Sequence, residues 1–275
     1  MSIFTRILGS LEARLSQPKL NIWRTIYINF RTLPTKQAIK LPIFIYGRVR
    51  LFMLNGQIIL ATENIKRGMI KIGRNADSFS LFDHSGFISL GSKNSRIIFD
   101  GPASISLNSK IRVPAGTLHF GEYVYIGASN RIICNGEYIK IGRYTRIAFE
   151  STIMNSGFHH VYNENKQNIV KTTRPITIGE FCWIGNRSSI TAGAKLKDYS
   201  IVCSNSLINK DFSYTDGENQ MLGGAPAKLI GMGFHRVFSP ILEEKIERWF
   251  KEHPSEIIYH LENFKDDTKH LNAEF

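Results

Sequence analysis

The sequence predicts an all-β solenoid, a parallel β-helix with a basic arm in front and a short α-helix behind. One observation is an aliphatic residue at every sixth position: Ile178, Ile184, Ile190, Leu196, Val202 and Ile208. A second is a small residue four positions after each of the first five: Cys182, Ser188, Ala194, Ser200 and Ser206. A period of six fits neither the helical repeat nor the two-residue alternation of a strand. It suits a short strand followed by a corner, so that three units close a triangular coil and stacked coils bury an aliphatic column.

The same rule extends upstream and indicates the domain organisation. Ile141, Ile147 and Ile153 keep the spacing, but Phe120, Ile126 and Ile132 run three residues out of frame, which predicts an insertion between the two groups. Less regular repeats extend the pattern back toward residue 70. We therefore expect a basic arm or cap at residues 1–50, the β-helix at 51–232 and a helical extension at 233–275.

The helical extension has clear local signals. Ser239 is a suitable helix cap, Pro240 suits the first turn, and apolar residues follow at helical spacing. We expect this helix to pack on the coils.

Composition excludes several classes of protein. Of the 275 residues, 43% are hydrophobic and 21% are charged, which is typical of a chain with a folded core. No apolar run approaches the roughly 18 residues of a membrane-spanning helix, and the first residues lack the layout of a secretory signal. The three cysteines form no closely spaced pair, which argues against a disulfide scaffold or a CxxC zinc site and favours a cytoplasmic protein.

The net charge of +12 is concentrated at the N-terminus. Residues 1–50 contain nine Lys or Arg and one acid, Glu12, and the bases alternate with aromatic and aliphatic residues. Such an arm can form a solvated cap over the end of the core, or contact the anionic inner face of a membrane. No nucleic-acid-binding motif accompanies the charge, so we expect no nucleic-acid partner.

Two segments carry a resemblance to a known family: Ile178-Gly-Glu-Phe-Cys-Trp-Ile-Gly185 and Gly223-Gly-Ala-Pro-Ala-Lys-Leu-Ile230. Together with the repeats over about residues 105–232, they resemble the left-handed β-helix (hexapeptide-repeat) acyltransferases. The galactoside and maltose acetyltransferases and the polysaccharide O-acetyltransferases are the most similar in pattern. The resemblance implies a left-handed coil, a homotrimer with sites between subunits, acetyl-CoA as donor, a carbohydrate acceptor and no metal.

The clean repeat is interrupted once, by residues 154–175, and long insertions in compact folds are commonly functional. The insertion contains adjacent histidines, His159 and His160. In the resembled family a histidine at this place, in a His-x-aliphatic context, is the catalytic base, and the order His159-His160-Val161 puts His159 there. A neutral imidazole can take the proton of an attacking hydroxyl group.

Further site residues follow from position. The family often has an acid two residues before the histidine, but Gly157 stands there, which leaves a backbone carbonyl or Glu150 to orient the ring. Asn130 and Asn155 are candidates for positioning the acceptor or stabilising the oxyanion. The resemblance implies a donor site, with the two lysines near the phosphates, formed by Trp183, Asn186, Ser204, Asn209, Lys210 and Lys228.

The sequence therefore predicts a coenzyme A-dependent O-acetyltransferase that acts on a sugar hydroxyl of a polysaccharide or glycolipid precursor. N-acetylation of an amino sugar is the alternative on the same fold, although residues 1–70 contain no Gly-rich phosphate loop. A non-catalytic β-helix that binds glycans or scaffolds an assembly is the alternative of another class. A zinc-dependent hydratase is disfavoured, because His84, His119, His159 and His160 lack the spacing of such ligands.

Overall fold

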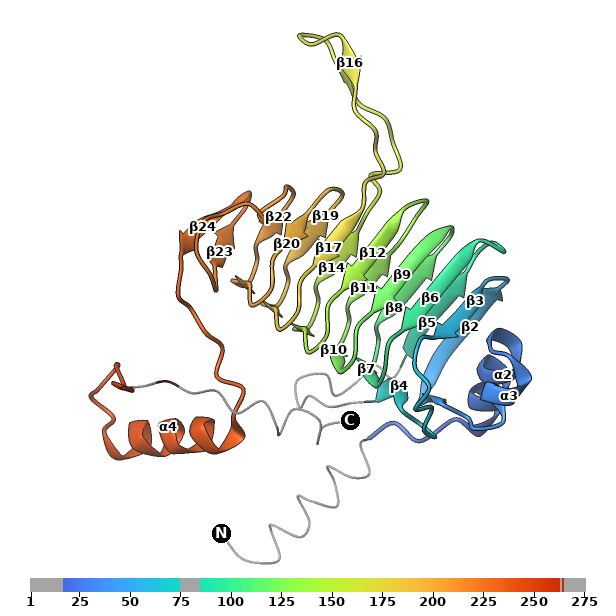
Figure 1. The fold of residues 1–275 in the computed structure, drawn as a ribbon, viewed down its shortest axis with the longest axis horizontal. Coiled ribbons are helices and arrows are strands. Elements are labelled where there is room, and N and C mark those ends of the chain that lie inside the picture. The colour runs from blue at the N-terminus through green and yellow to red at the C-terminus, as the bar shows by residue number, and fades with distance from the viewer. Residues whose placement is uncertain (1–16, 75–84, 263, 265–275) are drawn as a thin grey trace, which may run out of the picture.

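Short parallel strands stack into three sheets that form the sides of a triangular prism (Figure 1). The computed structural model of the chain describes residues 17–74, 85–262 and 264. The first sixteen residues of the predicted arm, His84 and most of the tail after residue 262 lie outside the described residues. The fold prediction is confirmed: the chain is a left-handed parallel β-helix with a C-terminal α-helix.

The three sheets are named here as faces, in the order in which the chain visits them. Face 1 contains β1 (Ile43–Ile45), β4 (Ile70–Arg74), β7 (Ala103–Ser106), β10 (Val124–Ile126), β13 (Arg146–Ile147), β18 (Trp183–Ile184), β21 (Ile201–Val202), β23 (Met221–Gly224) and β24 (Ala227–Gly231). Face 2 contains β2 (Arg48–Leu54), β5 (Ser85–Leu90), β8 (Lys110–Val113), β11 (Arg131–Ile133), β14 (Thr152–Met154), β19 (Ser189–Thr191) and β22 (Leu207–Ile208). Face 3 contains β3 (Gln57–Leu60), β6 (Ser95–Phe99), β9 (Gly116–Phe120), β12 (Tyr138–Ile141), β17 (Ile176–Ile178) and β20 (Lys195–Leu196).

Each coil has three corners. Corner 1 follows face 1 (residues 185–188 in one coil), corner 2 follows face 2 (192–194), and corner 3 follows face 3 (197–200). Equivalent corners of successive coils stack, so that residues far apart in the sequence become neighbours along one edge of the prism.

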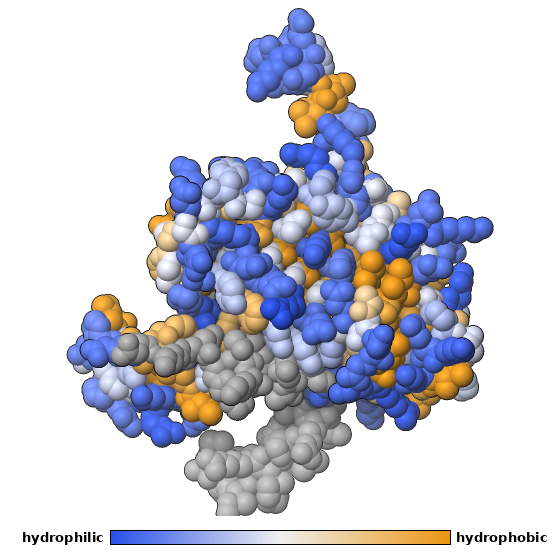
Figure 2. Space-filling view, in the orientation of Figure 1, coloured by the Kyte–Doolittle hydropathy of each residue, from blue (hydrophilic) through white to orange (hydrophobic). Residues whose placement is uncertain are grey.

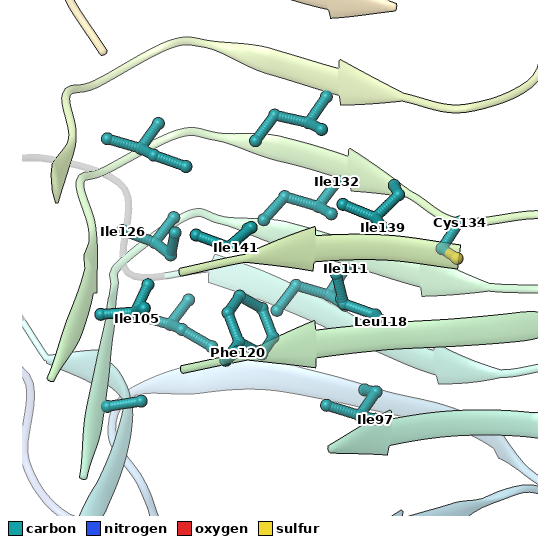
Figure 3. Packing of buried hydrophobic residues seen from close by; sticks show 14 of the residues in the cluster. Ile97, Ile105, Ile111, Leu118, Phe120, Ile126, Ile132, Cys134, Ile139 and Ile141 are labelled. Atoms are coloured by element: carbon teal, nitrogen blue, oxygen red, sulfur yellow. The ribbon is translucent and has the colours of Figure 1, made fainter. Parts of the chain in front are cut away.

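The predicted aliphatic column is the core. The six repeat positions from Ile178 to Ile208 are at most 2% exposed, and so are the five small positions between them. Figure 3 shows the same arrangement upstream, with Ile105 and Ile126 of face 1, Ile111 and Ile132 of face 2, and Leu118 and Ile139 of face 3 pointing into the prism. Fully burying one such side chain stabilises the fold by roughly 1.5–3 kcal/mol.

The small residues at the corners also link adjacent coils. Ser188 Oγ donates a hydrogen bond to the carbonyl oxygen of Cys203 (3.1 Å), and Thr145 Oγ1 donates to that of Gly179 (2.8 Å). Ser151 Oγ donates to the carbonyl oxygen of Gly185 (3.3 Å). A buried carbonyl group needs such a partner, and only a short side chain fits in the crowded corner.

Coil length explains the change of frame upstream. Ile105 pairs with Ile126 and Ile126 with Ile147, so these coils advance by 21 residues, whereas Ile184 pairs with Val202, an advance of 18. The extra residues lie between faces 2 and 3, where Gly116 and Gly136 have φ values of 89° and 75°. Glycine adopts that backbone region without steric cost. The insertion predicted between the two frames is therefore confirmed.

The two ends of the prism differ. At the N-terminal end lie helices α2 (Ile22–Thr32) and α3 (Thr35–Ala38), and β1 already begins at Ile43, before the predicted arm limit at residue 50. At the other end β24 turns back and pairs antiparallel with β23. In the described part of the chain, no helix is long and apolar enough to cross a membrane.

Helix α4 (Pro240–Glu252) begins as the sequence predicts, because Ser239 Oγ accepts a hydrogen bond from the Leu242 amide (3.3 Å). The expectation that it packs on the coils is wrong. None of its residues is buried, and it stands apart from the prism (Figure 1). Its aromatic side packs instead on the segment that follows, since the ring centroids of Trp249 and Tyr259 lie 5.1 Å apart.

Candidate active site

The insertion at residues 154–175 leaves the prism at corner 2, between β14 and β17 (Figure 1). Its base is a narrow neck in which Ser156 and Thr173 form an antiparallel bridge, and Thr173 Oγ1 donates to Ser156 Oγ (3.0 Å). Beyond the neck, residues 157–171 are all exposed. They include a two-stranded hairpin of β15 (Tyr162–Asn163) and β16 (Asn168–Ile169) that projects away from the coils.

His159 lies just beyond this neck. Its backbone N–H donates to the carbonyl oxygen of Gly157 (2.7 Å), which holds the chain in a tight turn where it leaves the coil. The imidazole is exposed and makes no hydrogen bond within residues 17–74 and 85–262. His160 is exposed as well. Both rings are therefore open to a reactant.

Glu150 does not orient His159. It lies at corner 1, and β14 separates it from the insertion, a distance of roughly 10 Å for three extended residues. Its carboxylate is engaged there, with Oε2 2.8 Å from Arg187 Nε.

The side chains of Asn130 and Asn155 are buried in the wall of the coil. Asn130 is 1% exposed, its Nδ2 donates to the carbonyl oxygens of Gly127 (2.7 Å) and Ala148 (2.8 Å), and its Oδ1 accepts from the Ser151 amide (2.9 Å). Asn155 is fully buried, and its Oδ1 accepts from the Asn135 amide (2.7 Å). An acceptor would have to displace these backbone bonds, so we do not carry either residue into the proposed mechanism.

The predicted donor residues form two groups. Asn186 and Ser204 stack at corner 1 in successive coils, where Ser204 Oγ donates to Asn186 Oδ1, and Lys228 extends the same edge because it pairs with Gly223. Lys210 and Asn209 lie at corner 2, two coils beyond the insertion. The strands of face 2 separate the two groups. Within one chain, the histidine shares an edge with Lys210 and not with Lys228.

Comparisons with known proteins agree with this architecture. No family model matches the chain. Galactoside O-acetyltransferase of Escherichia coli (strain K12) is 28% identical over 143 residues, which cover 50% of this chain and 68% of that protein. YJL218W of Saccharomyces cerevisiae (strain ATCC 204508 / S288c), which its name describes as an acetyltransferase, is 28% identical over 116 residues, 40% of this chain and 57% of that protein. The crystal structure of the polySia-specific acetyltransferase NeuO has a TM-score of 0.52 at 17% identity, covers 78% of this chain and 84% of that chain, and supports the fold alone.

The chain is similar to the hexapeptide-repeat acetyltransferases in sequence and in fold.

In this acetyltransferase, Trp183 has a partner that the sequence did not reveal. Trp183 lies on face 1 and is 39% exposed, and the guanidinium carbon of Arg236 lies 5.3 Å from the centroid of its indole ring. Arg236 also lies 5.1 Å from the ring centroid of Phe238. A cavity of about 190 Å³ lies beside them, between face 1 and residues 234–238. The C-terminal segment therefore contributes to the surface around Trp183.

A column of aromatic rings also escaped the sequence analysis. Tyr123, Tyr144, Phe181 and Tyr199 stack at corner 3 with centroids 4.9–5.1 Å apart. All four have φ between 53° and 59°. Their spacing follows coil length, and that spacing is the signal that could have identified them.

The acetyltransferase uses two of its cysteines as core residues. Burial raises the pKa of Cys182 from 9.0 to about 12, and burial also raises the pKa of Cys134 to about 12. Cys182 Sγ donates to the carbonyl oxygen of Lys197 (3.3 Å). A thiol that holds its proton is a poor nucleophile, so neither side chain is suited to carry an acyl group.

Proposed function

We propose that this acetyltransferase moves an acetyl group from acetyl-CoA to a hydroxyl group of a sugar in a polysaccharide or glycolipid precursor, with His159 as general base. The observation that carries the proposal is the insertion at corner 2, which interrupts the run of coils from β7 to β22 and presents an exposed histidine just beyond its neck. The name of the Escherichia coli relative, a galactoside O-acetyltransferase, supports a sugar hydroxyl as acceptor.

The reaction needs one proton to move twice. His159 takes the proton of the acceptor hydroxyl as its oxygen attacks the thioester carbonyl carbon, so that a carbon–oxygen bond forms and the carbonyl oxygen becomes negative. The tetrahedral intermediate collapses, the carbon–sulfur bond breaks, and the imidazolium returns the proton to the leaving thiolate. The exposure of the His159 ring supports this role, because both reactants can reach it from solvent.

The donor phosphates fit the two exposed lysines that flank face 2. Lys210 and Lys228 are compact cations at neighbouring edges of the prism, and Asn186 and Ser204 offer polar groups on the Lys228 edge. Because face 2 separates the edges within one chain, we propose that a site combines the corner 2 edge of one subunit with the corner 1 edge of its neighbour in a homotrimer. The donor and the three free cysteines suit the reducing cytoplasm, where we place the reaction.

Substitution of His159 tests the catalytic assignment. We expect His159→Ala to lower turnover by about a hundredfold or more, the range for a positioned general base, and to leave CoA affinity unchanged. His160→Ala is the matched control, since it removes the adjacent imidazole, which is also exposed. The assay follows release of free thiol from acetyl-CoA, with sugar and amino sugar acceptors in separate arms. A normal rate for His159→Ala would remove the base from the proposal, and transfer to the amino group alone would replace O-acetylation by N-acetylation.

Subunit complementation tests the composite site. One variant lacks the base (His159→Ala) and the other lacks the opposite edge (Asn186→Ala with Lys228→Glu), so each alone is expected to be inactive. Equal mixing and reassembly into random trimers leaves one intact site in every mixed trimer, which restores about a quarter of the wild-type rate. Sites confined to single subunits would show no recovery.

A further inference from the structure

Helix α2 has its polar side turned toward the protein and its apolar side turned outward. Its buried residues are Thr25, Ile28, Asn29 and Thr32, three of them polar. Helices at the surface of a folded domain ordinarily bury the apolar stripe and expose the polar one. The arrangement in α2 is the reverse and needs a physical reason.

The reason for the polar inner side is the first strand of face 1. The outer edge of β1 has backbone groups with no neighbouring strand, and the side chain of Asn29 takes that place: its Nδ2 donates to the carbonyl oxygen of Ile43 (2.7 Å) and its Oδ1 accepts from the Ile43 amide (3.1 Å). Thr25 Oγ1 accepts from the Ile45 amide (3.0 Å). The fold thus fixes the rotation of α2 about its own axis.

This rotation leaves a broad apolar surface exposed. The outward residues of α2 and their exposed fractions are Ile22 (62%), Trp23 (82%), Ile26 (38%), Tyr27 (53%) and Phe30 (51%). Figure 2 shows hydrophobic surface at this end of the prism, at the lower right. An exposed apolar surface of this extent, with three aromatic rings on one helix, is typical of an interaction site rather than of a solvated helix.

The segment that contains this surface carries charge of a single sign. Residues 17–50 contain seven Lys or Arg and no acid. Arg31, at the end of α2, and Lys36 and Lys40, in and after α3, are exposed. Between the lysines, Ile39 is 67% exposed. A segment that combines exposed apolar and aromatic side chains with bases and no acid matches a bilayer surface with anionic headgroups.

We propose that the outward side of α2 binds an anionic lipid bilayer, with the helix lying in the plane of the interface. Trp and Tyr rings favour the headgroup level, where the apolar ring is buried and the polar tip stays in water. At 11 residues, α2 is about 16 Å long, which is too short to cross the hydrocarbon core. The acetyltransferase would thereby be held beside lipid-linked acceptors, which goes beyond the proposed reaction and does not alter its chemistry.

Vesicle binding by the full chain tests the proposal. The probe is co-sedimentation with vesicles of phosphatidylcholine and phosphatidylglycerol, compared with vesicles of phosphatidylcholine alone. We expect binding to the anionic vesicles that weakens as salt is added. Trp23→Glu is expected to reduce partitioning at least about tenfold. Changing Lys36 and Lys40 to Gln is expected to reduce it about fivefold for each charge.

A matched control separates α2 from exposed apolar residues in general. Ile257 is 88% exposed and lies far from α2 in the sequence. Ile257→Glu likewise replaces an exposed apolar side chain by a carboxylate, and this variant is expected to bind as the wild type does. Both variants are expected to retain acetyl transfer to a soluble acceptor, which makes this test independent of the proposed reaction. No binding of the wild type to anionic vesicles would overturn the proposal, as would equal losses in the two Glu variants. A smaller oligomer for Trp23→Glu by light scattering would identify the surface as a subunit contact and would also overturn it.

Discussion

Replacing Asn130 by Ala tests whether this residue stabilises the coil or takes part in catalysis. The substitution removes three hydrogen bonds from a side chain that is 1% exposed. It leaves the Ala148 carbonyl group and the Ser151 amide without a side-chain partner, whereas the Gly127 carbonyl group keeps the hydrogen bond from Ser109 Oγ (3.0 Å). Each such bond contributes about 1 kcal/mol net, so we expect the free energy of unfolding to fall by about 3 kcal/mol. For a chain of this size that corresponds to a Tm lower by about 6–12 °C.

Thermal unfolding followed by circular dichroism measures the shift, at one protein concentration because assembly raises Tm. Asn209→Ala is the control, since Asn209 is exposed at corner 2, and its Tm is expected to stay within about 1 °C of the wild type. Below its own transition, Asn130→Ala is expected to keep wild-type turnover. An unchanged Tm together with a lost rate would refute the reasoning and return Asn130 to the catalytic machinery.

Two further outcomes are expected. Because the pKa of Cys134 and of Cys182 is raised from 9.0 to about 12 in the folded chain, unfolding releases their protons between those pH values. Raising the pH through this range therefore lowers the free energy of unfolding by about 1.4 kcal/mol per pH unit for each thiol. Urea titrations across this pH range should show a smaller loss of stability when both cysteines are replaced by Ala. The same dependence of the free energy of unfolding on pH in the wild type and in this variant would contradict the prediction. Replacing Lys210 or Lys228 by Gln should weaken CoA binding, measured by calorimetry, about ten- to a hundredfold. Lys245→Gln on α4 is the control and is expected to bind CoA as the wild type does. Unchanged CoA affinity in the Lys210 and Lys228 variants would exclude these lysines from the donor site.

The core could be predicted from the sequence because each coil buries the same few positions. One inward position per short strand must be aliphatic, and the residue at the following corner must be small, so the three-dimensional repeat is written directly into the spacing of Ile178, Ile184 and their successors. The longer upstream coils were visible only as a change of frame. Their cause is three extra residues between faces 2 and 3, which alter the spacing without altering the buried column.

The site was harder to predict, because corners bring together residues that lie 18, 21 or 37 positions apart. Asn130 has the residue type of a catalytic group, but its partners are backbone groups of its own and the next coil, which no local pattern reveals. Glu150 is near His159 in the sequence and lies at the opposite end of β14. An amphipathic pattern likewise shows that a helix has an apolar side and a polar side, but it does not show what the apolar side packs against. For this reason the prediction that α4 packs against the coils was wrong.

The hydrogen bonds of Asn29 and Thr25 also govern how copies of the chain can associate. A stack of parallel strands ends in a row of backbone donors and acceptors that would accept the strand of another molecule, and repeated pairing of that kind produces fibres. At one end of face 1 these two side chains occupy that row. At the other end the antiparallel return of β24 breaks the parallel order that a further coil would continue. A further parallel coil would therefore not continue face 1 at either end, so this face does not favour end-to-end association of copies of the chain.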